Sequence, residues 1–181
     1  MWQIMLFLLG ALVIAGISWR VFSNLRSHGF FRFLAFEAMW AVIVINIPWW
    51  FHDVLSLRQV VSWTLLLGSL GLAISGFFLL LTAGRSSGKR SSTNFAFEQT
   101  SRLVTAGPYR YIRHPLYTSL ILLVWGTAFK TGSFASIFFS LLATGFLYLT
   151  ALLEEEENLE RFGEAYVKYM DSTRMFVPGV F

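Results

Sequence analysis

Long apolar runs separated by short polar stretches are the main pattern along the chain. A membrane helix needs about 20 mostly apolar residues, and five runs can be read in this way. They are Met1–Trp19, Phe33–Phe51, Val60–Thr82, Leu116–Phe129 and Phe134–Leu153. The fourth run is short, and only Lys130-Thr131-Gly132 and Ser133 separate it from the fifth, so the two predict a tight helical hairpin. The pattern predicts an all-α membrane bundle of about five transmembrane helices, or four if the hairpin is only re-entrant.

Composition narrows the class of protein. Of the 181 residues, 56% are hydrophobic and 13% are charged, whereas a soluble domain is about 25% charged. Disorder is excluded because it requires low hydrophobicity and high charge. The chain has no cysteine, which rules out disulfides, thiolate metal sites and a cysteine nucleophile. We expect one membrane domain over residues 1–181, with a three-helix part at 1–82 and a core at 95–178.

The basic residues predict an orientation. Twelve of the 14 lysines and arginines would lie on one side of a five-helix arrangement. These twelve are Arg20, Arg26, Arg32, Arg85, Lys89, Arg90, Arg102, Arg110, Arg113, Arg161, Lys168 and Arg174. Only Arg58 and Lys130 would lie on the other side. Because cytoplasmic loops are enriched in basic residues, we expect an outer N-terminus and a cytoplasmic C-terminus, in a bacterial or archaeal inner membrane.

Two polar regions would lie on the cytoplasmic side. Gly84–Ser92 is a polar, flexible stretch, and the residues from Phe95 to His114 form a connector. Glu154–Asp171 reads as a charged helical continuation of the last span, that is, a cytoplasmic tail helix that ends near Ser172. The residues able to carry chemistry are therefore concentrated in the second half of the chain.

The first candidate motif is LVTAGPYRYIRHPLY, residues 103–117. Gly107-Pro108 predicts a turn, and Pro115 suits the first position of a helix. Arg113 and His114 would then lie at the positive end of that helix, which attracts anions such as carboxylate or phosphate. On spacing alone, a basic anchor that meets lipid headgroups is favoured over an anion-binding site.

The second motif is four adjacent glutamates, Glu154–Glu157. On a helix they point in different directions, so at most two can face one site. A solvated collar at the membrane edge is slightly favoured over a carboxylate pair that binds a cation. In a third stretch, Phe162–Tyr169, apolar residues recur at helical spacing, which suits a helix lying at the membrane surface. We expect Tyr166 and Tyr169 to serve mainly in packing.

Together, these motifs resemble the isoprenylcysteine carboxyl methyltransferase and phospholipid methyltransferase superfamily of integral membrane enzymes. That family has a stretch like LVTxGPYRYxRHPxY, then a helical hairpin, paired glutamates, FGxxYxxY and a final Arg-Phe-x-Pro. The resemblance covers about Phe95 to Pro178, with the glutamate pair at Glu154-Glu155. One departure is that Met175 occupies the place of the family's final arginine, and Arg174 lies one residue earlier.

The resemblance implies methyl transfer from S-adenosylmethionine at the cytoplasmic membrane face. The acceptor would be a lipid or lipophilic small molecule from the bilayer: a prenylcysteine-like carboxylate, a phospholipid amine or a thiol. No metal and no nucleic-acid partner is implied. For catalysis itself no residue is assigned, and His114 and Arg174 are candidates.

The resemblance also implies a cofactor site. Glu154 or Glu155 would pair with the amine or ribose hydroxyls of the cofactor, and Arg113 with His114 would hold its carboxylate. The whole expected set is Leu103, Val104, Gly107, Tyr109, Arg113, His114, Pro115, Tyr117, Glu154 and Glu155. Two other classes remain open: a reductase-like membrane protein that binds a nicotinamide cofactor, and a non-catalytic small membrane protein. Retention of S-adenosylmethionine without NADPH would favour the methyltransferase.

Overall fold

The computed structural model describes residues 1–24, 27–83 and 103–180. Within them the chain forms six α-helices and three short 3₁₀ turns, with no strand. The helices are α1 (Trp2–Ile17), α2 (His28–Asn46), α3 (Leu57–Ala83), α4 (Pro115–Ala128), α5 (Phe134–Phe162) and α6 (Glu164–Ser172). The 3₁₀ turns are η1 (Trp19–Ser23), η2 (Ile47–Trp49) and η3 (Gly107–Arg110). Helices satisfy every backbone hydrogen bond within one segment, as the lipid interior requires, and the predicted all-α class is confirmed.

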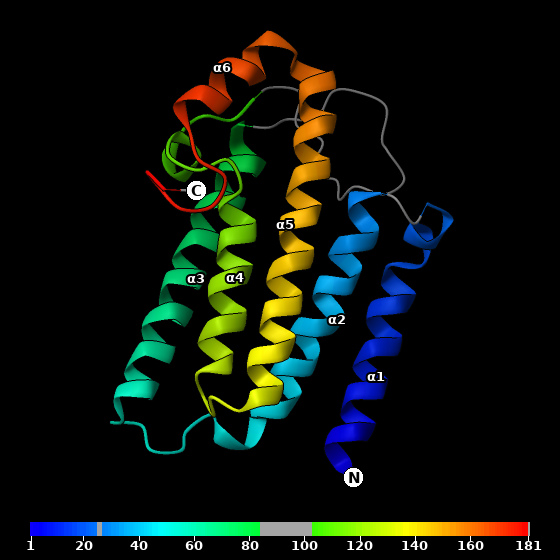
Figure 1. The fold of residues 1–181 in the computed structure, drawn as a ribbon, viewed down its shortest axis with the longest axis vertical. Coiled ribbons are helices and arrows are strands. Elements are labelled where there is room, and N and C mark those ends of the chain that lie inside the picture. Colours follow the sequence, from blue (N-terminus) through cyan, green and yellow to red (C-terminus); the bar gives the residue numbers. More distant parts are fainter. Residues whose placement is uncertain (25–26, 84–102, 181) are drawn as a thin grey trace.

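The five apolar helices run along the long axis of the molecule in alternating directions (Figure 1). The N-terminus and the C-terminus therefore lie at opposite ends. We call these the hairpin end, which carries the turn between α4 and α5, and the α6 end (Figure 1).

Three helical segments are long and apolar enough to cross a membrane: His28–Trp49, Leu57–Thr82 and Phe134–Phe162. α1 and α4 are apolar but shorter, with 16 and 14 residues. A 14-residue helix is about 21 Å long, less than the roughly 30 Å of a bilayer core. The length and apolar composition of these helices identify an integral membrane protein. α4 and α5 form the predicted hairpin.

The bundle is held by close contact between helices and by hydrogen bonds to main-chain carbonyls. α2 packs mainly against α5, and α3 against α4. Across the α3–α4 contact, Ser62 Oγ donates to the carbonyl of Gly126 at 2.6 Å, and Ser69 Oγ donates to that of Ser119 at 2.7 Å. Two buried apolar clusters lie between α2, α4 and α5: Ala35, Tyr117, Leu147, Ala151, Met175 and Phe176 in one, and Ala38, Met39, Val42, Val124, Ala128 and Ala143 in the other.

Buried polar side chains fasten the hairpin end. Asn46 on α2 donates to Ser136 Oγ on α5 at 2.8 Å and accepts from the backbone N–H of Thr131 at 3.2 Å. Lys130, in the turn between α4 and α5, is fully buried. Its ammonium donates to Gln59 Oε1 at 2.9 Å and lies 3.6 Å from the centre of the Trp63 ring. The turn is therefore attached to both α2 and α3.

The structure corrects the expected tail. One helix was expected over Glu154–Asp171, but α5 ends at Phe162 and α6 begins at Glu164. Gly163 between them has a φ of 55°, a conformation that glycine adopts without steric cost. The chain therefore turns there, and α6 lies across the end of the bundle (Figure 1). The stretch Gly84–Ser92 and the basic residues Arg26, Arg85, Lys89, Arg90 and Arg102 lie outside the described residues.

Candidate functional site

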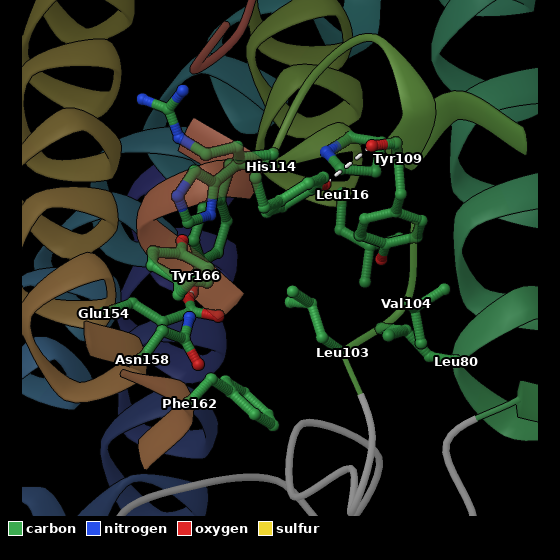
Figure 2. Close-up of a pocket in the computed structure, with 14 residues that line it drawn as sticks. Leu80, Leu103, Val104, Tyr109, His114, Leu116, Glu154, Asn158, Phe162 and Tyr166 are labelled. Atoms are coloured by element: carbon green, nitrogen blue, oxygen red, sulfur yellow. Dashed lines mark hydrogen bonds between the residues drawn. The ribbon is translucent and has the colours of Figure 1, made fainter. Parts of the chain in front are cut away.

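The first motif forms a turn followed by the start of α4, as its glycine and prolines predict. Gly107 has a φ of 57°, and a Cβ there would come within 2.6 Å of Leu79 Cδ1, so the position favours glycine. Pro115 is the first residue of α4. This geometry directs Tyr109 and His114 toward a pocket at the α6 end (Figure 2).

The C-terminal tail is hydrogen-bonded to this turn through its backbone. The N–H of Arg113 donates to the carbonyl of Arg174 at 2.7 Å, and the N–H of Arg174 donates to that of Tyr111 at 3.1 Å. The N–H of His114 donates to the carbonyl of Met175 at 3.1 Å. Arg174, a catalytic candidate from the sequence, thus contributes its main chain, and its exposed side chain does not line the pocket.

One stripe of α5 forms the polar wall of the pocket. Glu154, Asn158 and Phe162 follow one another at intervals of four residues, so they share one face of the helix. The facing wall is apolar, with Leu80 from the end of α3 and Leu103 and Val104 from the connector (Figure 2). The complete lining is Leu80, Leu103, Val104, Tyr109, Arg113, His114, Pro115, Leu116, Tyr117, Glu154, Asn158, Phe162, Tyr166 and Tyr169.

Glu155 lies behind this wall and binds side chains of the first motif. Its Oε1 accepts from Arg113 Nε at 2.5 Å and lies 3.2 Å from His114 Nε2. Arg113 also donates to the carbonyl of Thr173 at 2.8 Å, and Glu155 is only 6% exposed. The resemblance assigned this arginine and this glutamate to different groups of a cofactor, but in the structure they are paired with each other.

Glu154, in contrast, faces the pocket and is half-buried. The hydroxyl of Tyr117 donates to its Oε2 at 2.6 Å. Among the described residues, Glu154 has no basic side chain within ion-pair distance. It is the carboxylate that remains available to a cationic ligand.

Two tyrosines of α6 pack beneath the pocket and also line it. Tyr166 and Tyr169 are buried, and burial raises the pKa of both phenols above the ordinary value. Both are therefore neutral hydroxyls over the physiological range. Tyr169 donates to the carbonyl of Tyr109 at 2.6 Å, which fixes α6 to the first motif.

The structure brings together most of the residues expected from the sequence. Of the ten expected cofactor residues, eight line the pocket. Gly107 shapes the turn, and Glu155 lies behind the wall. Six further residues that line the pocket were not expected from the sequence: Leu80, Leu116, Asn158, Phe162, Tyr166 and Tyr169. Asn158 and Phe162 could have been predicted from their spacing, because residues four and eight positions after Glu154 share its face of the helix.

His28 and Glu157 form a contact between α2 and α5 outside the pocket. In the structure His28 begins α2 and is 1% exposed, and its Nδ1 lies 2.6 Å from Glu157 Oε1. The Glu157 side chain is 48% exposed and at the same time joins α5 to α2 through this contact.

Several known proteins are similar to part of this chain. A methanethiol S-methyltransferase from Pseudomonas sp. (strain GM41(2012)) is 33% identical over 70 residues, which are 39% of this chain and 26% of that protein. A protein-S-isoprenylcysteine O-methyltransferase from Schizosaccharomyces pombe is 34% identical over 77 residues, 42% of this chain and 33% of that protein. The cobalt-zinc-cadmium resistance protein CzcN from Cupriavidus metallidurans is 31% identical over 114 residues, 63% of this chain and 49% of that protein.

These aligned segments span between about a quarter and a half of the relatives' lengths. No solved structure shows a significant match to the chain. The phospholipid methyltransferase family matches residues 63–165, a span from the second turn of α3 into α6 that includes the whole hairpin. The resemblance read from the motifs is confirmed, and because the match covers more than half of the sequence, the chain belongs to the phospholipid methyltransferase family.

Proposed function

We propose that this chain transfers a methyl group from S-adenosylmethionine to an amphiphilic or small apolar acceptor at the cytoplasmic face of the membrane. The observation that supports this proposal most directly is the pocket at the α6 end. There the two motifs face each other, one wall polar and one apolar, although Arg113 and Glu155 are 42 positions apart in the chain.

The residues of the pocket suit this cofactor by their chemistry. S-adenosylmethionine carries a cationic amine, a carboxylate, ribose hydroxyls and a flat apolar base. Glu154 and Asn158 offer a carboxylate and an amide for the amine and hydroxyls. Leu103 and Val104 offer an apolar surface for the base. The amino end of α4 offers backbone N–H groups for a carboxylate.

Bound in this pocket, the cofactor supplies an electrophilic methyl group on a sulfonium. The work of the chain is to align donor and acceptor and to exclude water, which is where most of the rate of such a displacement arises. His114 is held by Glu155 on one side and stacks on the Tyr117 ring at 5.4 Å on the other. We assign it a positioning role at the start of α4.

The orientation and the acceptor belong to the same proposal. The basic residues favour a cytoplasmic α6 end, where a water-soluble cofactor is available. We expect apolar acceptors to reach the pocket from the bilayer. The names of the relatives suggest two acceptor chemistries, a small thiol and an isoprenylated cysteine, and the family name a third, a phospholipid.

The test uses the full chain purified in detergent or in lipid nanodiscs. Calorimetry is expected to show binding of S-adenosylmethionine and none of NADPH. Labelled cofactor is then offered with methanethiol, an S-prenylated cysteine, or vesicles containing phosphatidylethanolamine, and we expect label in one product. Binding of NADPH instead, or of neither cofactor, would contradict the proposed function.

A further inference from the structure

Glu37 places a carboxyl group in the middle of a membrane-spanning helix. It lies halfway along the 19 residues of α2, which is about 13 Å from either end. No described residue forms a hydrogen bond or an ion pair with its side chain. Arg32, the nearest basic residue in the sequence, is buried and points about 140° away around the helix. Because acidic side chains are costly inside a membrane, they mark ligand sites or ion pathways.

An apolar cavity of about 360 Å³ lies on the same side of α2, between α1 and α5. Its lining includes Gln3 and Phe7 of α1, Ala41 and Val44 of α2, and Phe139 of α5. Glu37, Ala41 and Val44 follow one another at intervals of four and three residues, so they share one face of α2. Ile4, which also lines the cavity, is 64% exposed, so the cavity is open to molecules dissolved in the bilayer. Its volume is within the range of about 300–1,000 Å³ for small-molecule sites.

Two hydrogen bonds fix the α1 wall of the cavity to α2, which lies between α1 and α5 (Figure 1). Trp40 Nε1 donates to the carbonyl of Phe7 at 3.1 Å, and Gln3 Nε2 donates to that of Val44 at 3.0 Å. Within the described lining, Gln3 alone is polar. Val44 is seven residues after Glu37, which is about 10 Å along α2. The site therefore has a carboxyl group at one end, an amide at the other and apolar walls between them.

The carboxyl group decides which kind of molecule suits the site. A phospholipid can fill the apolar part with an acyl chain, but its charged groups stay at the membrane surface, about 13 Å from Glu37. A small amphiphile with a protonated amine brings its positive charge to the carboxylate itself. Opposite charges attract more strongly in such a medium of low dielectric constant than in water. Charge complementarity therefore favours a small cationic amphiphile over a lipid tail.

We propose that Glu37 and this cavity form a binding site for a lipophilic amine. The ammonium group of the ligand lies beside Glu37, and its apolar body extends along the cavity toward Gln3. The site is separate from the pocket at the α6 end, whose lining contains no residue of α1 or α2. Its occupancy is therefore measured without reference to the proposed methyl transfer.

The test compares decylamine with decanol, which has the same chain and no charge. Binding to the full chain in nanodiscs of zwitterionic lipid is measured by calorimetry against empty nanodiscs. At pH 7 an alkylamine is protonated, since its pKa resembles the value of about 10.4 for lysine. Glu37→Gln keeps the size of the side chain and removes the charge, and we expect it to lower the decylamine affinity about tenfold, or about 1.4 kcal/mol. The decanol affinity should stay the same.

Two further variants make the result specific. Glu156→Gln removes the same charge from an exposed position at the α6 end and should leave both affinities unchanged. Ala41→Leu fills the cavity and should weaken the binding of both probes. Thermal unfolding of each variant checks that it is folded.

The wild type gives a readout that needs no variant. Dicyclohexylcarbodiimide modifies carboxyl groups that are reached from the bilayer, and mass spectrometry locates the product. Decylamine should protect Glu37 from this modification, and decanol should not. Equal decylamine affinities of the wild type and Glu37→Gln, or modification of Glu37 at the same rate with and without decylamine, would overturn the proposal. Unchanged binding of both probes in Ala41→Leu would overturn the placement of the ligand in the cavity.

Discussion

The two ends of the bundle hold buried cations in different ways. At the α6 end Arg113 meets the carboxylate of Glu155 at 2.5 Å. At the hairpin end Lys130 is fully buried among neutral groups, the amide of Gln59 and the indole rings of Trp63 and Trp50, the latter at 5.1 Å. At the hairpin end, neutral groups surround Lys130 and no described carboxylate takes part. At the α6 end, Glu155 pairs with Arg113, and a second carboxylate, Glu154, faces the pocket. We therefore expect the hairpin end to have a structural role and the α6 end to accept a charged ligand.

The largest expected difference between the two ends is in their labelling by a reagent that cannot cross the membrane. The chain has no cysteine, so a single introduced thiol is labelled without background. Leu55 at the hairpin end is 94% exposed, and Val180 at the α6 end is 78% exposed. In intact cells a membrane-impermeant maleimide should label Leu55→Cys, and it should label Val180→Cys only after permeabilisation. Labelling of both thiols in intact cells would place the two ends on the same side.

The next largest effect is a loss of stability when the ion pair at the α6 end is broken. Glu155→Gln leaves the guanidinium of Arg113 buried without a charged partner, and breaking a buried pair in this way costs about 3–5 kcal/mol. We expect that loss in the free energy of unfolding, measured by denaturant titration in detergent micelles. Glu156→Gln, at an exposed position one residue later, should stay within about 0.5 kcal/mol of the wild type. Equal stabilities of the two variants would show that the pair does not hold the site together.

The cation of the hairpin end should matter for stability alone. Lys130→Met removes contact with two indole rings and the amide of Gln59, and we expect a loss of about 1–2 kcal/mol. Affinity for S-adenosylmethionine should not change, because the pocket lies at the other end of the bundle. A clear loss of affinity would contradict the division between the ends.

Lys130 also gives the stability a pH dependence of known sign. Burial lowers the pKa of Lys130 below its ordinary value of 10.5, so in the window between the two values the unfolded chain binds more protons. The free energy of unfolding should therefore rise with pH as 10.5 is approached from below. In Lys130→Met this part of the rise should be absent.

The smallest effect is expected for the pair of Glu157 and His28. The Glu157 side chain is 48% exposed, so solvent screens the interaction, and Glu157→Gln should cost at most about 1 kcal/mol. Ligand affinity should stay at the wild-type value. A loss as large as that of Glu155→Gln would mean that the two glutamates share one function.

Local patterns in the sequence predicted the helices well, because apolar runs and turn residues act within a few positions. Gly107 and Pro115 placed the turn and the start of α4 correctly. The register of the four glutamates comes from the structure instead: Leu147, Ala151 and Glu155 lie on one buried face of α5 at intervals of four, and Glu154 lies on the next face.

Side-chain contacts between residues far apart in the sequence could not be predicted from these local patterns. The contact of His28 with Glu157 joins residues 129 positions apart, and the ammonium of Lys130 reaches a glutamine 71 positions away. Such partners depend on which helices become neighbours, and hydropathy does not specify that. The functional consequence is largest at Arg113, whose expected free guanidinium is taken up by Glu155.

The location of the ligand is tested most directly by protection of an introduced thiol. Asn158→Cys places the only thiol of the chain on the polar wall of the pocket, and Glu156→Cys places it on the exposed face of the same helix. S-adenosylmethionine should slow maleimide labelling of Asn158→Cys in proportion to its occupancy and leave labelling of Glu156→Cys unchanged. Labelling of Asn158→Cys at the same rate with and without saturating S-adenosylmethionine, in a variant shown by calorimetry to bind it, would contradict the placement of the cofactor site on this stripe of α5.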